Sequence, residues 1–460
     1  MDPAGRPVLL VGLPESGLLN PLLVLAGELA RRGVPNLLFA TDEPRRDEVE
    51  ALGAASPVRF VSLGAVLPAM SAVTWDDETY RAVMQKSRIR GFQELLQRTF
   101  DPSLSVGKFR ALERIVLAER PAVMVIDVMA SFAVDVALKH GIPYVLSSPF
   151  LPSNGLVATT PFGRSVTPRG YPTPRSGLPY PMTARQQLAN RLFRLRTVTM
   201  FARPAMSRRL ARAGRIRAEL GVPARAGRTM AAFDHAELVL CYSLAGLDYP
   251  FDLPAKIRPV GAMVPPLPQA PGHHEVTSWL DAHESVVYQA FGTITRLRRD
   301  EVANFVEVAR RLQGRHAVLW KLPAEQQNLL PTDLPGNLRI ENWLPSQLDV
   351  LAHPHVRVFF NHGGGNAFHE AVYFGKPQVV RPLWVDCHDQ AVRAGSLGIG
   401  LPLDSPDVDV DDITDKLLRV LEDPAFTARS QRFAAQMREA GGRTAGADAL
   451  LSLNLLATVR

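Results

Sequence analysis

A strand, a glycine turn and a helix follow one another directly between residues 356 and 374, and this order narrows the choice of fold more than any other feature of the sequence. Val356–Phe360 is a β-branched and aromatic run of strand length, which is typical of a parallel strand covered on both faces. The turn, Asn361–Asn366, contains three consecutive glycines, and the apolar residues of the helix behind it recur on one side. The sequence therefore predicts a parallel α/β sheet with a turn that lets the backbone approach a ligand.

The same segment carries polar side chains suited to a nucleoside diphosphate. The first N–H groups of a helix lie at the positive end of its dipole and can bind a phosphate group. His362, at the start of the turn, can donate to a diphosphate oxygen, and Glu370 can accept from both hydroxyls of a vicinal diol. The polar cluster Asp386–Gln390 follows a second expected strand, Gln378–Leu383, at the sheet edge where α/β proteins bind ligands. Taken alone, a glycine turn of this kind is as often an ordinary loop.

Two domains are expected, because 460 residues exceed the size of one ordinary hydrophobic core. Strand-like and helix-like segments alternate in both halves, which predicts a parallel sheet in each. We expect an N-terminal domain at 1–245, a linker at 246–272 that ends in a proline-rich run, and a C-terminal domain at 273–440. The proline-rich segment 150–181 is expected to form a long irregular connection.

Composition places the chain among soluble globular proteins, with 46% hydrophobic and 21% charged residues. No apolar run reaches the length of a membrane span, and the N-terminus lacks a basic segment with a cleavage site. The two cysteines, Cys241 and Cys387, lie far apart in the sequence, which favours a reducing compartment over a disulfide framework. A cytoplasmic protein is therefore expected.

Positive charge is concentrated in one segment of a chain whose net charge is +7. No Asp or Glu occurs from 136 to 218, while ten arginines lie between Arg185 and Arg217. Such a segment can contact an anionic membrane surface or a partner protein, or attract an acidic substrate. A solvated helical face in an arginine-rich chain is the simpler interpretation. Nucleic acid is not expected, because no recognised binding module accompanies the charge.

The order and spacing of several residues resemble the signature of the UDP-glycosyltransferases, the family 1 glycosyltransferases of the GT-B fold. The residues that carry it are His362, Gly363, Gly364, Asn366, Glu370, Pro377, Pro382 and Asp386. Upstream, Asn342–Pro345 and Leu351–Pro354 look like the start of the same signature, with one additional residue between them. Phe291–Thr293 resembles the phosphate-contacting turn of the family. The resemblance covers about the last 180 residues.

This resemblance implies a GT-B fold of two Rossmann-like domains that face each other across a cleft. It also implies an inverting, metal-independent transfer of a sugar from a UDP or dTDP donor to a small natural-product acceptor, as in antibiotic biosynthesis. No cofactor beyond the donor is expected, and the chain would act as a monomer or homodimer. Residues 441–460 would form a helix that crosses back to the N-terminal domain, and the segment 150–181 would lie over the acceptor pocket.

Donor contacts follow from the same resemblance. They are expected at Gly17, Thr293, Trp343, Leu344, His362, Gly363, Gly364, Gly365, Asn366, Glu370, Asp386 and Cys387. Trp343 would stack on the base and Glu370 would bind the ribose, which mildly favours UDP over dTDP because a 2′-OH gives the carboxylate a second donor. Cys387 stands where the family has Gln, and a thiol is a poor hydrogen-bond partner. A deoxy, amino or pentose sugar therefore becomes an alternative to glucose.

The general base departs from the family pattern, because Leu18 occupies the position of the usual His. Asp127 matches the carboxylate that normally orients that His, so we expect Asp127 to accept the proton directly, with Ser16 and Glu15 as lesser candidates. An acceptor acidic enough to need little help is the alternative, and an ordinary strand-end aspartate is the structural one. The loss of the His also leaves open a catalytically silent sugar-nucleotide-binding partner, an epimerase or a peripheral lipid glycosyltransferase.

No metal site is expected. The acidic run Asp407–Asp412 precedes a helix, where carboxylates favour the dipole, and His273–His274 lacks a partner at a useful spacing.

Overall fold

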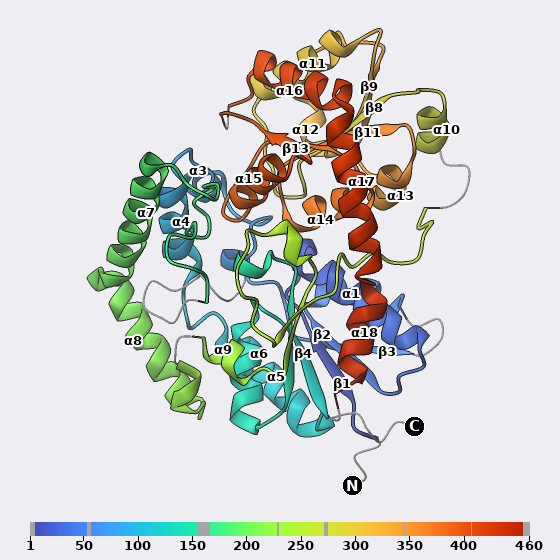
Figure 1. Ribbon diagram of the computed structural model, residues 1–460. Helices are drawn as coiled ribbons and strands as arrows, with labels where there is room; N and C mark the ends of the chain where they lie inside the picture. Colours follow the sequence, from blue (N-terminus) through green and yellow to red (C-terminus); the bar gives the residue numbers. More distant parts are fainter. Residues whose placement is uncertain are drawn as a thin grey trace. The chain divides into compact units, whose positions relative to one another are not determined.

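The computed structural model describes residues 5–52, 57–154, 166–227, 230–270, 275–344, 346–405 and 407–453. The chain forms two compact units (Figure 1). The first comprises Met1–Ser176, Tyr180–Met263 and Ala440–Arg460, and the second comprises Gly177–Pro179 and Val264–Glu439. The predicted fold class is confirmed, since each unit is an α/β domain built on one parallel sheet.

The first unit contains a seven-stranded sheet in the order β3-β2-β1-β4-β5-β6-β7, and every neighbouring pair of strands is parallel. The strands are β1 (Val8–Val11), β2 (Leu37–Thr41), β3 (Val58–Ser62), β4 (Val123–Asp127), β5 (Tyr144–Ser148), β6 (Leu238–Cys241) and β7 (Ile257–Pro259). Because β7 belongs to this sheet, the first unit extends to Met263, beyond the expected boundary at 245.

Helices cover both faces of this sheet, as an all-parallel sheet requires. They are α1 (Ser16–Arg31), α2 (Arg46–Glu50), α3 (Asp77–Val83), α4 (Arg88–Thr99), α5 (Val106–Glu119), α6 (Ser131–His140), α7 (Ala184–Ala202), α8 (Pro204–Glu219), α9 (Ala231–His235) and α18 (Arg443–Leu451). Alternate residues of β1 point to opposite faces. Leu9 joins a core with α5 and α6, whereas Leu10 joins a core with α1 and α18.

The second unit repeats this plan with six parallel strands in the order β10-β9-β8-β11-β12-β13. They are β8 (Val286–Ala290), β9 (Ala317–Lys321), β10 (Leu338–Glu341), β11 (Val356–Asn361), β12 (Gln378–Val380) and β13 (Gly400–Pro402). The helices are α10 (Glu275–Asp281), α11 (Arg299–Leu312), α12 (Ala324–Gln327), α13 (Gln347–Ala352), α14 (Gly365–Tyr373), α15 (Cys387–Leu397), α16 (Val410–Glu422) and α17 (Pro424–Glu439). Val287 packs towards α11 and α16, and Tyr288 packs towards α10, α13 and α14.

Each sheet has one point at which the strand order changes direction, between β1 and β4 in the first unit and between β8 and β11 in the second. In open α/β sheets, ligands bind at the carboxyl ends of the strands at such a point. The turns after these four strands are therefore the places to examine. Within the described residues, no helix combines the length and apolar character that crossing a membrane requires.

Candidate functional site

The candidate nucleotide site of the second unit is built on the turns that follow β8 and β11. Gly292 follows β8 and His362 follows β11, and the two turns are in contact. A Cβ atom added to Gly292 would lie 2.7 Å from Cε1 of His362, and Gly292 has a φ of +75°. Only glycine suits this position, because it has no Cβ and adopts positive φ readily. The imidazole of His362 therefore packs directly on the backbone of the first turn.

His362 is prepared to act as a neutral hydrogen-bonding group. Burial lowers the pKa of its imidazole to about 4, so the ring is uncharged at physiological pH. Its buried Nδ1 has no hydrogen-bond partner among the residues that the structure describes. A buried polar atom without a partner is costly unless a ligand or water satisfies it. This ring is therefore suited to donate to, or accept from, a bound ligand.

The glycine turn behind His362 leads into α14, which has Gly365 and Asn366 as its first two residues. Gly364 occupies the N-cap position and offers no side-chain cap, which leaves the first N–H groups of the helix available for an anion. The turn is held from below by Asn361, whose Oδ1 accepts from the N–H of Gly363 at 2.8 Å. The expected phosphate cradle is thus present in its backbone geometry.

Glu370 lies further along α14 within a polar group that includes two residues the sequence did not single out. Gln347, in the first turn of α13, donates from Nε2 to Oε2 of Glu370 at 2.7 Å and accepts from the hydroxyl of Tyr288 at 3.0 Å. Lys321, at the end of β9, interacts electrostatically with Glu370. Burial raises the pKa of Glu370 and lowers that of Lys321. The arrangement can bind a vicinal diol through the carboxylate and the amide together.

Trp343 presents an aromatic surface beside this group, since 67% of its side chain is exposed and Nζ of Lys321 lies 4.5 Å from the ring centroid. A base can stack on such a ring. Thr293 is also exposed. Leu344, in contrast, is buried in the core of the second unit, so only its backbone is available to a ligand. Pro345 lies outside the described residues.

Asp386 and Cys387 begin α15, and the glycine turn packs against them. A Cβ at Gly363 would lie 2.9 Å from the carbonyl oxygen of Cys387, and Gly363 has a φ of +78°. Cys387 is fully buried, and burial raises the pKa of its thiol, so the sulfur is neutral. One turn later, Gln390 is fully buried, and both polar atoms of its amide lack a partner among the described residues. Gln390 is therefore a further candidate ligand contact.

Asp127 ends β4 in the first unit, next to the turn that follows β1, and only 1% of it is exposed. Its Oδ1 accepts from the N–H of Met129 at 3.0 Å, and its Oδ2 accepts from the N–H of Leu13 at 3.4 Å. Burial nevertheless raises the pKa of this carboxyl to about 7, and the charge of Glu15 contributes to the rise. A carboxyl with this pKa exchanges its proton near physiological pH.

Glu15, Ser16 and Gly17 form the turn between β1 and α1. Glu15 is half-buried, and its pKa is raised by burial, although a hydrogen bond from Ser71 opposes the rise. The hydroxyl of Ser16 accepts from the guanidinium of Arg45 at 3.2 Å. Gly17 is exposed, and a Cβ there would meet no atom within 4 Å, so no steric reason requires glycine.

Two further polar pairs border this turn and were not predicted. Lys108 forms a buried ion pair with Asp42, the residue after β2, and its ammonium also donates to the carbonyl of Ala65 at 3.1 Å. Ser147, opposite Asp127 in the sheet register, shares a buried hydrogen bond of 2.8 Å with the hydroxyl of Tyr242. No local sequence pattern signals either pair, because each joins elements distant along the chain.

The acidic run before α16 has a structural role, as expected. Asp409 is the N-cap of that helix and accepts from the N–H groups of Asp411 and Asp412. Among the described residues, no three His, Cys, Asp or Glu side chains lie together in a way that could hold a metal ion. His273 and His274 fall outside the described part of the chain.

Comparison with known proteins gives similarity at three levels. A sequence model described as "UDP-glucoronosyl and UDP-glucosyl transferase" matches residues 65–434. Erythritol-mannosyl-transferase 1 of Pseudozyma antarctica is 38% identical over 123 residues, which are 26% of this chain and 20% of that protein. The 2-hydroxyacylsphingosine 1-beta-galactosyltransferase of Rattus norvegicus is 29% identical over 198 residues, 42% of this chain and 35% of that protein. The chain thus spans a third or less of the length of these two relatives.

Solved structures match over almost the whole chain. The glycosyltransferase of kitacinnamycin has a TM-score of 0.69 and 21% identity, and the match covers 97% of this chain and 98% of that one. CalG4, the calicheamicin glycosyltransferase, has a TM-score of 0.65 and 18% identity, with 98% of each chain covered. At these identities the likeness concerns the fold.

Proposed function

The chain belongs to the UDP-glucoronosyl and UDP-glucosyl transferase family, and on this basis we propose that it transfers a sugar from a UDP donor to a small natural-product acceptor. The observation that carries the proposal is the glycine turn at His362, where a neutral imidazole with an unpartnered nitrogen adjoins the N-terminus of α14. The family and the turn together favour a nucleoside diphosphate as the ligand.

Transfer with inversion requires three changes at the anomeric carbon. The acceptor hydroxyl gives up its proton, its oxygen forms a bond to the anomeric carbon, and the bond from that carbon to the diphosphate oxygen breaks on the opposite face. The electron pair of the broken bond leaves with UDP. His362 and the N–H groups at Gly365 and Asn366 would stabilise the charge that develops on the diphosphate, which needs no metal ion.

We assign the role of general base to Asp127. Its pKa of about 7 is near the optimum for proton transfer at physiological pH, and it lies where the strand order of the first sheet changes direction. Because the carboxyl is almost completely buried, the acceptor hydroxyl must enter the turn at Leu13 or transfer its proton through one water molecule. Glu15, half-buried in the same turn, is the second candidate.

For the donor, Glu370 and Gln347 together favour a ribose with both hydroxyls, hence UDP over dTDP. The thiol of Cys387 offers the sugar a weak partner, whereas the amide of Gln390 offers a strong one. A deoxy, amino or pentose sugar is therefore an alternative to glucose. A small natural-product acceptor agrees with the printed names of the structural neighbours, and a lipid acceptor agrees with the galactosyltransferase among the relatives.

A catalytically silent sugar-nucleotide-binding protein is the second candidate function, and Leu18 in place of the family's His favours it. Both candidates predict that UDP binds, and they differ in turnover. A thermal-shift titration with UDP, dTDP, GDP and their sugars tests the site, since a ligand at 100 times its Kd stabilises the native state by about 2.7 kcal/mol. The stabilisation should disappear in Glu370→Ala.

Release of UDP that depends on an acceptor then decides between the two functions. Turnover that is lost in Asp127→Asn and kept in Glu15→Gln supports the proposal. Tight UDP binding without turnover for a broad panel of phenolic, alcohol and lipid acceptors would establish the silent function instead. An absence of stabilisation by any nucleotide would overturn both.

A further inference from the structure

Helix α7 exposes a stripe of leucines to solvent. Leu188, Leu192 and Leu195 are 58%, 47% and 56% exposed. Spacings of four and three residues place them within about 60° of arc on the helix, at roughly 100° per residue. The buried residues of α7, Asn190 and Thr197, lie on the opposite side of the helix. The leucines therefore point away from the protein core, and Figure 1 places α7 and α8 at the edge of the first unit, in green.

Arginines flank this stripe on both sides. At the same angular spacing, Arg185 and Arg196 lie on one side of the leucines, and Arg191 and Arg194 lie on the other. All four are exposed, and none forms an ion pair within the described part of the chain. The segment 136–218 holds no Asp or Glu, so no acidic side chain of its own lowers the positive charge.

Two arginines of α8 show by contrast what a structural role looks like in this segment. Arg217 binds Asp135 at 2.8 Å. Arg209 donates to the carbonyl oxygens of Leu96 and Phe100 at the end of α4. The four arginines around the leucine stripe have no such partner among the described residues, and they remain available to an external anion.

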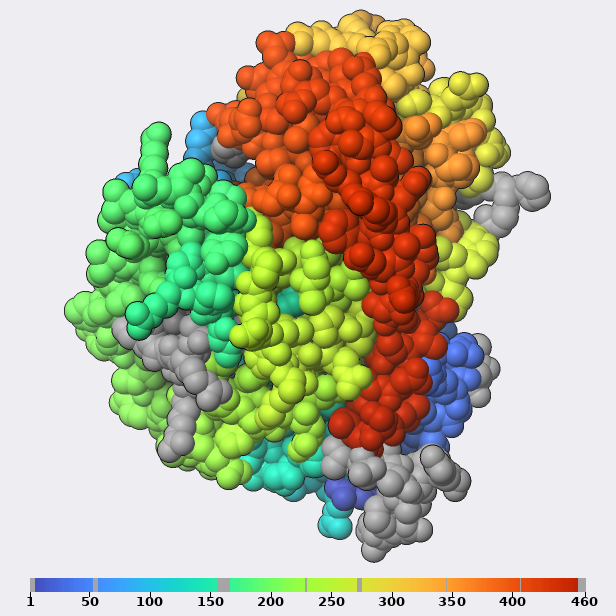
Figure 2. Space-filling view, viewed as in Figure 1, coloured from blue at the N-terminus to red at the C-terminus, as the bar shows by residue number. Residues whose placement is uncertain are grey.

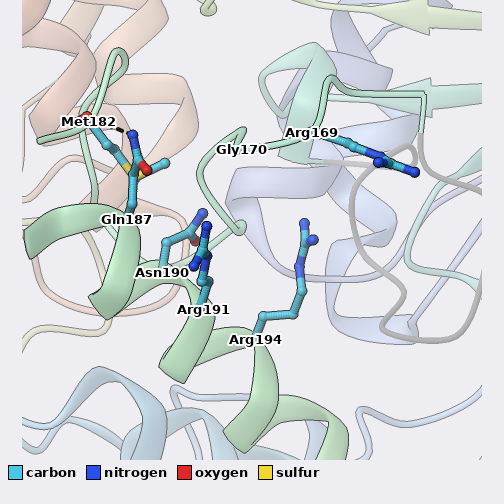
Figure 3. Close-up of a pocket in the computed structure, with 7 residues that line it drawn as sticks. All are labelled: Arg169, Gly170, Met182, Gln187, Asn190, Arg191 and Arg194. Carbon is cyan, nitrogen blue, oxygen red and sulfur yellow. Dashed lines mark hydrogen bonds between the residues drawn. The ribbon is translucent and has the colours of Figure 1, made fainter. Parts of the chain in front are cut away.

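A cavity of about 350 Å³ opens beside the stripe (Figure 3). It is lined by Arg169, Gly170, Met182, Gln187, Asn190, Arg191 and Arg194. Its wall is fixed to α7, because the amide of Asn190 accepts from the N–H of Thr173 at 2.8 Å and donates to the carbonyl of Tyr171 at 2.9 Å. Guanidinium groups at such a cavity suit a phosphate group.

We propose that this face, the α7 face, docks on an anionic lipid bilayer. The three leucines would enter the boundary between headgroups and acyl chains, and the flanking arginines would bind lipid phosphates. An apolar stripe between rows of cationic side chains is the pattern of a helix that lies in a membrane interface. A stripe without the charges would fit another protein equally well, but single-sign charge on both flanks is complementary to an anionic surface. The space-filling view shows the α7–α8 region, in green, open to solvent in that orientation (Figure 2).

Co-sedimentation of the whole protein with vesicles tests this proposal. The probes are phosphatidylcholine vesicles with and without phosphatidylglycerol, each at low and high salt. Binding is expected only with phosphatidylglycerol at low salt, and each arginine near the surface contributes about fivefold. Arg191→Glu with Arg194→Glu should weaken binding about 25-fold or more. Leu188→Ser, Leu192→Ser and Leu195→Ser together should abolish it.

Matched controls come from α5 of the same unit. Leu117 is 56% exposed, and Arg110 and Arg114 are exposed. Leu117→Ser and the pair Arg110→Glu with Arg114→Glu should bind vesicles as the wild type does. Each variant is first shown to be folded by an unchanged thermal transition and an unchanged response to UDP.

Four results would overturn the proposal. They are absence of binding to phosphatidylglycerol vesicles, full binding by the leucine variant, equal loss in the α5 controls, and self-association in sedimentation velocity that the leucine changes remove. The last result would assign the α7 face to a second copy of the chain. Sugar transfer is a separate measurement, so the two ideas stand or fall independently.

Discussion

Replacing Asp127 by Asn should make the protein more stable at alkaline pH while it impairs catalysis. The carboxyl has a pKa of about 7 in the folded protein, against an ordinary value of 3.8. A difference of about three pKa units at about 1.4 kcal/mol per unit corresponds to about 4 kcal/mol. Because the folded-state pKa is raised, the folded protein holds this proton more tightly than the unfolded chain does. The free energy of unfolding therefore falls as pH rises from about 4 to about 7.

Asn resembles the protonated carboxyl in having one acceptor and one donor, and it never ionises. Asp127→Asn should thus match the wild type near pH 4 and exceed its free energy of unfolding by up to about 4 kcal/mol at pH 8. Urea denaturation at both pH values measures this difference. Asp252→Asn, at an exposed aspartate of the same unit, provides the control and should show no such pH dependence.

Catalysis should respond in the opposite direction. Loss of a general base lowers kcat by about 10²- to 10⁴-fold. A variant that is more stable at pH 8 and almost inactive would support the assignment of Asp127. The reasoning is refuted if the stability difference between variant and wild type is the same at both pH values, because the carboxyl would then have an ordinary pKa.

Three further predictions concern the two units. Trp343→Ala should weaken UDP binding by about 1 to 3 kcal/mol, measured by titration calorimetry, and unchanged affinity would exclude stacking on this ring. Gly292→Ala should cost about 1 to 3 kcal/mol in urea denaturation, because alanine would adopt positive φ there and its Cβ would press on His362; a neutral result would contradict the close packing of the two turns. Lys108→Met should lower the free energy of unfolding by about 3 to 5 kcal/mol by leaving Asp42 buried without its partner, and a smaller loss would indicate that water reaches that carboxylate.

Much of the fold was predictable because local patterns and tertiary packing agree. The expected helix Ser131–His140 and strand Tyr144–Ser148 have the same bounds in the structure, and Gly141, with a φ of +63°, ends the helix between them. In contrast, β13 was not expected, since Gly400–Pro402 is too short for a periodic pattern. The polar helix α4 was also missed, because its mostly polar sequence shows little apolar periodicity.

The backbone of the nucleotide site was likewise predictable, since strand, glycine turn and helix are contiguous in the sequence. The side-chain partners of Glu370 were not. Gln347 and Lys321 reach it from α13 and from the end of β9, and strand order in a sheet cannot be read from local pattern. The deep burial of Asp127 was also beyond local reasoning, because packing from several elements creates it.

The packing of α18 on α1 has a consequence for the timing of folding. Arg32, just after α1, forms an ion pair with Asp448 of α18, and these residues are 416 positions apart. Leu22 and Leu25 of α1 share one core with Ala447 and Leu450. At about 5 to 20 residues per second, a ribosome needs about 20 to 80 seconds to synthesise the chain between them. During that interval the apolar face of α1 is incompletely covered, so the domain that is synthesised first is the last to complete its core.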